Sequence, residues 1–359
     1  IFGFEKALSL ISGMFSFALL DKLEEKIYLC RDRFGEKPLY YGFQKDTFMF
    51  ASELKALKPH PDFEGVVDRE ALGYFMKYSY VPTPKSIYLG IKKLNPGCYV
   101  RIKYENNNWY LKEEIRYWNL YKENFPSQKI NYYEVLEKTE SLLIDSIKMQ
   151  SSADVSVGSF LSGGIDSSLV SVLMQANSTS KINTYTIGFS EEDYDESKHA
   201  SKIAKYIGTD HNEYIASHDD IMNVIPSLPL LYDEPFADSS QIPTYLVCNF
   251  ASKDITVALS GDGGDEIFSG YNRYLWAPKF FNLINRYPSF LRKLFKSSTK
   301  RLRVNHIQKL YDVFKIILPK SFHVVAPAEK FEKILRIIDK EDEFEVYDTL
   351  RSIMHIDNP

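Results

Sequence analysis

The stretch that decides the fold reads Ser159-Phe160-Leu161-Ser162-Gly163-Gly164-Ile165-Asp166-Ser167-Ser168. Apolar residues at Val155, Val157 and 160–161 precede it and predict a strand buried in a sheet. The run 169–174 follows directly and predicts an apolar helix. A glycine turn between a strand and a helix suits an anion, because glycine lets backbone N–H groups approach closely and the helix N-terminus adds a positive dipole end.

The side chains of this turn favour a nucleotide phosphate. Ser162, Ser167 and Ser168 can donate hydroxyls, whereas Asp166 can face a phosphate only across a cation. Asp166 is therefore a candidate Mg²⁺ ligand. The loop has no Lys, so it is not a Walker P-loop. A Ser-Gly pair alone is more often an ordinary turn that caps a helix, but the full pattern between strand and helix is far more specific.

A second glycine-rich stretch, Ser260-Gly261-Asp262-Gly263-Gly264-Asp265-Glu266-Ile267-Phe268-Ser269-Gly270-Tyr271, follows a predicted strand at 255–259. Its carboxylates would repel a triphosphate unless a divalent cation lay between them, which is the arrangement of metal-assisted nucleotide chemistry. The alternatives are an acidic surface turn or a weak calcium loop. The spacing is not that of an EF-hand.

The pattern around these loops predicts an α/β domain with a doubly wound parallel sheet over residues 126–359. Strands expected at 155–161, 182–189, 212–215 and 255–259 alternate with helices at 167–176 and 195–207. Ligands of such sheets bind beyond the carboxyl ends of the strands, where both glycine loops stand.

Residues 1–125 predict a separate α+β domain built on an antiparallel sheet. A helix is expected at 68–80, and the composition of 105–128 is typical of a surface connection. The expected strands of the sheet are 14–20, 27–32, 38–42, 47–52 and 98–104.

Composition narrows the class of protein. At 359 residues two domains are expected, and a net charge of −4 gives no pull toward nucleic acid or an anionic membrane. The apolar run at 8–20 is too short and polar to span a membrane. Three widely spaced cysteines without ligand spacing favour reduced thiols and a cytoplasmic location. Because the chain begins at Ile1, we expect it to be a fragment.

The first loop resembles the pyrophosphate-binding loop (PP-loop) of the N-type ATP pyrophosphatases. With the second loop, it is similar to the asparagine synthetase family through three segments. These segments are 160–168, Asp233-Glu234-Pro235-Phe236-Ala237-Asp238-Ser239-Ser240, and 258–266. Two interpretations of Asp233, Glu234 and Asp238 remain open: they hold a substrate ammonium or a loop, or they have a structural capping role.

The resemblance implies roles for individual residues. ATP would contact the first loop and parts of two strands, Mg²⁺ would be held by two aspartates, and two further residues would act in catalysis. The implied ATP-binding residues are Leu161, Ser162, Gly163, Gly164, Asp166, Ser167, Ile187, Ser260 and Gly261. The implied metal ligands are Asp166 and Asp265, and the implied catalytic residues are Asp262 and Tyr271.

The resemblance also implies a ligase reaction in amino-acid biosynthesis. A carboxylate, expected to be aspartate, attacks the α-phosphate of ATP to give an acyl-AMP and pyrophosphate. Ammonia, normally derived from glutamine, then displaces AMP to give the amide, asparagine. Positioning and charge stabilisation would supply most of the catalysis. A homodimer is expected, because the family often dimerises.

The N-terminal segments 13–18, 31–41 and 51–57 are similar to the later half of class II glutamine amidotransferase domains, whose nucleophile is an N-terminal cysteine. Position 1 is not Cys, so we expect this chain to lack glutaminase activity. Cys30 lies within a predicted strand, and we interpret it as a small core residue. The family's basic phosphate-binding residue beyond the synthetase loops is not found either. Together with the missing N-terminal cysteine, this predicts truncation at both ends.

Two alternatives remain open. One is a different PP-loop ligase, such as a tRNA thiolase or NAD synthetase, acting on another acceptor; the amidotransferase-like segment argues against it. The other is a catalytically silent fragment or subunit that binds nucleotide without turnover.

Overall fold

The structure is a computed structural model that describes residues 3–105, 108–120, 131–190, 195–299 and 327–354. It forms two compact units. The first consists mainly of Ile1–Gly164 and Ser168–Leu259, and the second of Ile165–Ser167 and Ser260–His355. The first turn after the glycine loop thus groups with the second loop. The expected domain boundary at 125/126 lies outside the described residues and stays a prediction.

The first four-stranded antiparallel sheet has the order β1-β2-β6-β7. Its strands are β1 (Ser16–Asp21), β2 (Lys26–Arg31), β6 (Cys98–Glu105) and β7 (Asn108–Arg116). The helix α1 (Phe4–Leu10) packs Leu8 against Cys30 and Tyr99.

The strand β7 corrects the expectation of a surface connection at 105–128. Polar composition suggested a connection, but β7 pairs along β6 from Cys98↔Arg116 to Glu105↔Asn108. Only part of its apolar surface, such as Trp109, packs on the core, so its other face tolerates the charged residues that misled the prediction.

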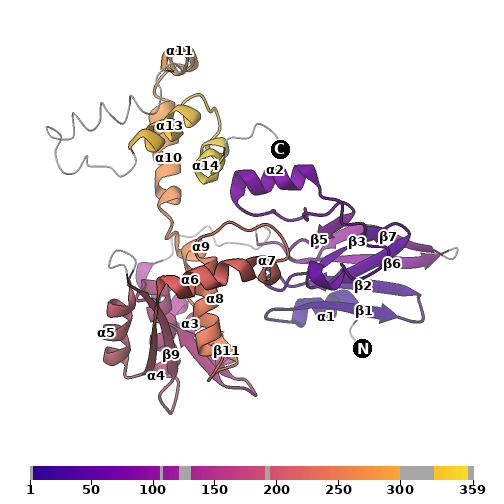
Figure 1. Ribbon diagram of the computed structural model, residues 1–359, viewed down its shortest axis with the longest axis horizontal. Coiled ribbons are helices and arrows are strands. Elements are labelled where there is room, and N and C mark those ends of the chain that lie inside the picture. Colours follow the sequence, from indigo (N-terminus) through magenta and orange to yellow (C-terminus); the bar gives the residue numbers. More distant parts are fainter. Residues whose placement is uncertain (1–2, 106–107, 121–130, 191–194, 300–326, 355–359) are drawn as a thin grey trace. The chain divides into compact units, whose positions relative to one another are not determined.

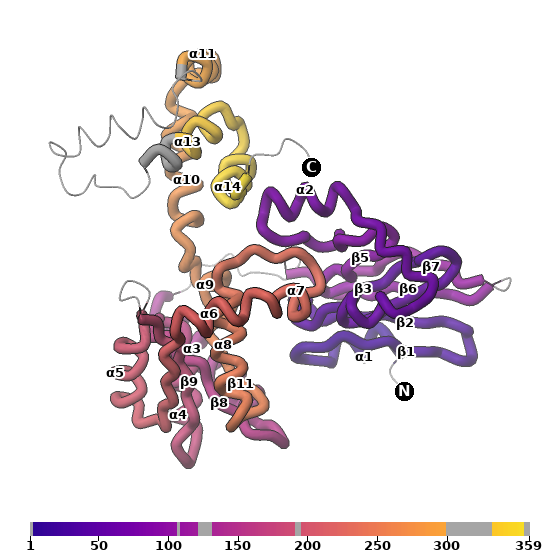
Figure 2. Tube along the Cα trace, viewed as in Figure 1, coloured from indigo at the N-terminus to yellow at the C-terminus, as the bar shows by residue number. Residues whose placement is uncertain are grey.

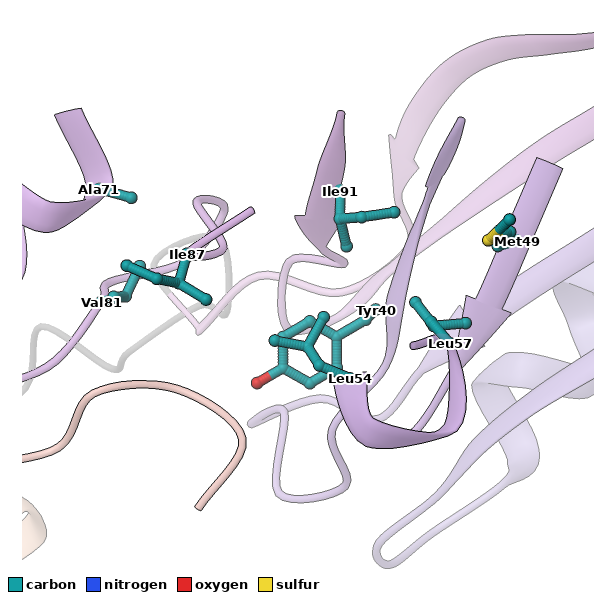
Figure 3. Close-up of a cluster of buried hydrophobic side chains, with 8 residues drawn as sticks. All are labelled: Tyr40, Met49, Leu54, Leu57, Ala71, Val81, Ile87 and Ile91. Carbon is teal, nitrogen blue, oxygen red and sulfur yellow. The ribbon is translucent and has the colours of Figure 1, made fainter. Parts of the chain in front are cut away.

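A second antiparallel sheet has the order β4-β3-β5, so the expected single meander was wrong. Its strands are β3 (Tyr40–Gln44), β4 (Thr47–Ala51) and β5 (Ile91–Lys93), and the short helix η1 (Leu54–Ala56) follows β4. Its core packs Tyr40, Met49, Leu54 and Ile91 together with Ala71 of α2 (Arg69–Tyr78) (Figure 3).

The parallel sheet confirms the predicted α/β fold, with the order β10-β9-β8-β11. Helices cover both of its faces (Figure 1). Tyr185 of β9 packs against Ala251 of α8, whereas Gly188 of the same strand lies against Ser197 at the start of α5. The elements are α3 (Tyr132–Ser151), β8 (Val157–Phe160), α4 (Ile165–Ala176), β9 (Asn183–Phe189), α5 (Ser197–Ile207), β10 (Asp210–Ala216), α6 (His218–Val224), η4 (Ile225–Ser227), α7 (Leu228–Leu231), α8 (Gln241–Ala251) and β11 (Val257–Leu259).

The two strands that precede the candidate loops, β8 and β11, are neighbours in this sheet. The chain runs from β8 outward to β9 and β10, whereas β11 pairs on the other side of β8 through Leu259↔Ser159. The order therefore reverses between β8 and β11. In open parallel sheets, such a switch point is where ligands bind beyond the carboxyl ends of the strands.

The second unit is helical. Its helices are α9 (Gly264–Phe268), α10 (Asn272–Ile284), α11 (Ser289–Thr299), α13 (Pro327–Ile337) and α14 (Glu343–Arg351). Figure 2 shows α10, α13 and α14 close to one another. Ala277 and Ile284 of α10 form the core of this unit with Ile337 of α13 and Val346 of α14. Within the described residues, the helices are too short or too polar to cross a bilayer.

Candidate functional site

The loop after β8 leaves the sheet at Leu161, which is 1% exposed. Its backbone N–H donates to the carbonyl of Tyr185 at 3.0 Å, and Thr186 Oγ1 donates to its carbonyl. Ile187 lies one residue further along β9, within the sheet. The strands thus bring Leu161 and Ile187 close together, but the Leu161 N–H is already used within the sheet.

The glycines of this loop allow a close approach to α5. Gly163 has φ +88°, and a Cβ there would lie 2.9 Å from His199 Cβ and 3.0 Å from Ala200 N. Gly164 is the N-cap of α4 and supplies no side-chain cap, while Ser168 Oγ donates to its carbonyl at 2.6 Å. The helix begins at Ile165, two residues before the predicted start. A strand, a glycine turn and a helix without a side-chain cap at its N-cap are the parts of an anion site.

We call the loop after β11, residues 260–271, the acidic loop. A hydrogen bond between two of its side chains stabilises its first turn. Ser260 Oγ donates to Asp262 Oδ2 at 2.9 Å. Gly263 has φ +89°, a conformation that favours glycine, and it is the N-cap of α9. The turn carries three carboxylates within five residues, those of Asp262, Asp265 and Glu266.

The two loops meet at Asp166, within the second unit. A Cβ on Gly261 would lie 2.7 Å from Ser167 N, and one on Gly264 would lie 2.5 Å from Asp166 Cγ. Only a glycine backbone leaves room for the Asp166 carboxyl beside this loop. Asp166 is thus brought against the acidic loop, and its role as a metal ligand stays a prediction. The need for glycine at 261 and 264 was missed, because it arises from a contact between distant segments.

Asp265 and Tyr271 lie at the far end of the same loop. Asp265 contacts Gly270 closely, and its carbonyl accepts the N–H of that glycine at 2.9 Å. The hydroxyl of Tyr271 donates to Glu266 Oε1 at 2.8 Å, and this bond raises the pKa of Tyr271 to about 12. Tyr271 is therefore protonated at neutral pH and donates its hydroxyl proton to Glu266, so it does not act as a general base.

The donor set fits magnesium held jointly with a nucleotide. In the described part of the chain, no three His, Cys, Asp or Glu side chains are grouped to hold a metal alone. Mg²⁺ in nucleotide sites commonly takes one or two carboxylates and completes its shell with phosphates and water. Asp166 and the carboxylates of the acidic loop are of this type.

The acidic residues of the segment 233–238 form ion pairs and hydrogen bonds with other parts of the protein. Glu234 forms an ion pair with Lys93 and accepts the N–H of Ile87 at 2.8 Å. Lys55 Nζ lies 3.7 Å from Asp233. Asp238 Oδ1 accepts Ser240 N at 2.8 Å, a contact at the start of α8 that supports the capping interpretation. No local signal could identify Lys93 or Lys55 as partners, since they are distant in sequence.

Cys30 is a core residue, as predicted. It is fully buried, and burial raises the pKa of its thiol to about 12. A thiol in this environment is a poor nucleophile.

The comparisons with known proteins agree with this architecture. A family model described as asparagine synthase matches residues 138–357, and a glutamine amidotransferase domain matches 2–118. The chain belongs to the asparagine synthase family, which confirms the resemblance that the sequence indicated.

Individual proteins of this family are similar to the chain over most of its length. Asparagine synthetase 1 (glutamine-hydrolyzing) from Bacillus subtilis is 36% identical over 292 residues, which cover 81% of this chain and 44% of that protein. A relative from Methanocaldococcus jannaschii is 35% identical over 87% of this chain and 61% of its own length. The chain thus spans about two fifths to three fifths of these relatives. Among solved structures, a glutamine-dependent NAD⁺ synthetase from Acinetobacter baumannii covers 76% of this chain and 53% of its own, at a TM-score of 0.29 and 15% identity.

Proposed function

We propose that this chain carries the ATP-dependent amide-forming site of a glutamine-hydrolyzing asparagine synthetase. The acceptor would be the side-chain carboxylate of aspartate, activated as an acyl-AMP with release of pyrophosphate. Ammonia would then displace AMP. One observation supports this proposal most: the Asp166 carboxyl lies against Gly264. Gly264 belongs to the loop that follows β11, the strand that pairs with β8.

Each residue would have a limited task, because little covalent chemistry falls to the protein in adenylyl transfer. Backbone N–H groups at Ser162, Gly163 and Gly164 would bind phosphate oxygens, and Ser167 would donate its hydroxyl. Backbone groups of Leu161, Ile187, Ser260 and Gly261 would hold the adenosine. Asp262 would take part in forming the acyl-AMP. Tyr271 would lie near the acceptor, with its hydroxyl proton donated to Glu266.

Asp166 and Asp265 would hold Mg²⁺, which would neutralise charge that builds on the leaving pyrophosphate. Residues 2–118 match a glutamine amidotransferase domain, so we propose glutamine as the ammonia source of the whole protein. A cytoplasmic location and a homodimer are part of the same proposal.

An ATP–pyrophosphate exchange assay with a panel of carboxylates tests the proposal. We expect Mg²⁺-dependent exchange with aspartate and its loss in Asp265→Ala. Glu341→Ala is a matched control in the same unit, since the Glu341 side chain is 69% exposed and 3.9 Å from Lys293. Exchange with a different carboxylate and none with aspartate would identify that carboxylate as the acceptor instead. ATP binding without any exchange would favour a silent nucleotide-binding subunit.

A further inference from the structure

Arg273 is held on an aromatic platform beside the acidic loop. It is the second residue of α10, and its guanidinium carbon lies 4.0 Å from the ring centroid of Tyr271 and 5.9 Å from that of Tyr274. A guanidinium at such distances is attracted by the aromatic ring. The guanidinium thus has a defined place.

The platform is itself anchored. Tyr271 is tied to Glu266 through its hydroxyl, and the Tyr274 ring stacks on Tyr347 of α14 with centroids 6.0 Å apart and planes at 11°. Tyr271 therefore links the acidic loop to Arg273 through one side chain: the hydroxyl contacts the loop and the ring carries the arginine.

Arg273 has no anionic partner among the described residues. No carboxylate oxygen of these residues lies within 4.0 Å of its nitrogens, and its Nε is buried without a hydrogen-bond partner. A buried Nε of this kind also occurs in Arg292 and Arg351, but three other arginines of this helical unit do have partners for their terminal nitrogens. Arg292 donates to backbone carbonyls, Arg336 pairs with Glu332, and Arg351 pairs with Asp348.

The carboxylates of the acidic loop likewise lack a charged partner within the described residues. Asp262, Asp265 and Glu266 make no ion pair with a Lys or Arg in the described parts of the chain. A short segment thus carries three carboxylates and a guanidinium that do not neutralise one another. Asp262 and Glu266 are exposed, whereas Asp265 and Arg273 are half-buried, so a dissolved ligand can reach all four groups. The carboxylates can therefore bind a cation, and the guanidinium an anion.

We propose that Arg273 binds an oxyanion of the substrate, either the carboxylate of the acceptor or a phosphate of ATP. A guanidinium binds both with paired N–H···O bonds, which a lysine ammonium cannot reproduce. The inference rests on the proposed function and extends it. Arg273 is an anion-binding residue on the same segment as the proposed metal-binding carboxylate, and Tyr271 sets the position of both groups.

The experiment measures binding to the full chain by thermal unfolding, with L-aspartate, inorganic pyrophosphate and adenosine as separate probes in the presence of Mg²⁺. The variants are Arg273→Ala and Arg273→Lys. The matched control is Lys279→Ala, because Lys279 lies on the same helix with Nζ 5.2 Å from the Trp276 ring. We expect Arg273→Ala to weaken binding of one anion about tenfold or more. Arg273→Lys should recover binding in part, and Lys279→Ala should behave as wild type.

The probes separate the outcomes. Selective loss of aspartate binding assigns Arg273 to the acceptor carboxylate, and selective loss of pyrophosphate binding assigns it to the phosphates. Equal losses for both anions and adenosine would mean a structural role and would overturn the proposal. So would unchanged binding of both anions in Arg273→Ala, or a wild-type chain that binds neither anion.

Exchange kinetics distinguish this inference from the proposed function. If the wild type shows exchange, Arg273→Ala should raise the KM of the affected substrate more than it lowers kcat. If the wild type shows no exchange yet Arg273→Ala selectively loses an anion, the amide-forming activity fails while the anion site stands.

Discussion

The Cγ atom of Asp166 lies 2.5 Å from the place that a Cβ atom would take on Gly264. The two residues belong to different loops, and the missing side chain of one makes the room for the carboxylate of the other. Most of the proposed metal chemistry depends on this contact.

Gly264→Ala should therefore displace the Asp166 carboxyl. Gly264 has no left-handed backbone conformation, so alanine is acceptable to the helix itself and the cost arises from the contact. We expect exchange activity to fall about 100-fold, as for other displacements near 1 Å in active sites. The double variant Asp166→Ala/Gly264→Ala should regain part of the thermal stability lost in Gly264→Ala but not the activity, because the Cβ of residue 166 stays 3.0 Å from the added Cβ. Full activity in Gly264→Ala would contradict the placement of Asp166.

Glu234→Gln should destabilise the chain strongly. The Glu234 and Lys93 side chains are 11% and 14% exposed. Removing the Glu234 charge leaves the buried Lys93 ammonium with the carbonyl of Val81 but without a counter-charge. Burial already lowers the pKa of Lys93. We expect a loss of about 3 kcal/mol in the free energy of unfolding, measured by urea titration.

The control for that change is Lys103→Met. Lys103 lies 2.6 Å from Glu105, and their side chains are 39% and 36% exposed. An exposed pair contributes at most about 1 kcal/mol. Similar losses in Glu234→Gln and Lys103→Met would show that the Lys93–Glu234 pair is open to water.

The three thiols should differ in reactivity. Cys30 and Cys98 are buried, and burial raises the pKa of each to about 12, whereas Cys248 is exposed. Iodoacetamide should modify Cys248 alone in the native protein and all three thiols after unfolding in urea. Mass spectrometry of the peptides gives the result. Native labelling of Cys30 at the rate of Cys248 would refute the assignment of Cys30 to the core.

Tyr185 should contribute a stability that disappears at high pH. Burial, and then the charge of Asp254, raises the pKa of Tyr185 to about 12, and its hydroxyl lies 3.2 Å from Asp254 Oδ2. The folded state thus holds the phenol proton more tightly than the unfolded chain, whose tyrosine has a pKa of about 10. The contribution is present below pH 10 and is lost as the pH rises through 12.

Tyr185→Phe isolates this effect. The variant should be less stable than wild type by about 1 kcal/mol at pH 8, and the difference should narrow above pH 10. Thermal unfolding as a function of pH measures it. Tyr206→Phe is the control, since Tyr206 is 92% exposed and should show no difference at either pH. A constant difference between wild type and Tyr185→Phe from pH 8 to 12 would exclude the raised pKa.

Local patterns predicted much of the fold. The helix at 68–80 appears as α2 with Asp68 as its N-cap, because capping and amphipathic spacing are local properties. The parallel order was predicted from the alternation of strands and helices. Where the predictions failed, tertiary packing outweighed composition: β7 is a strand because it pairs with β6, and the expected meander divides into two sheets.

By itself, the sequence determined the two glycine loops, the strands that carry them and the family to which they belong, since these are written in short contiguous runs of residues. Only the tertiary structure decided which groups from distant segments meet. It placed Asp166 against Gly264, paired Glu234 with Lys93, and left Arg273 on Tyr271 without an anion. The physical reason is that a side chain's partner depends on how strands and helices pack, and nothing in the local sequence around Glu234 or Asp166 records it.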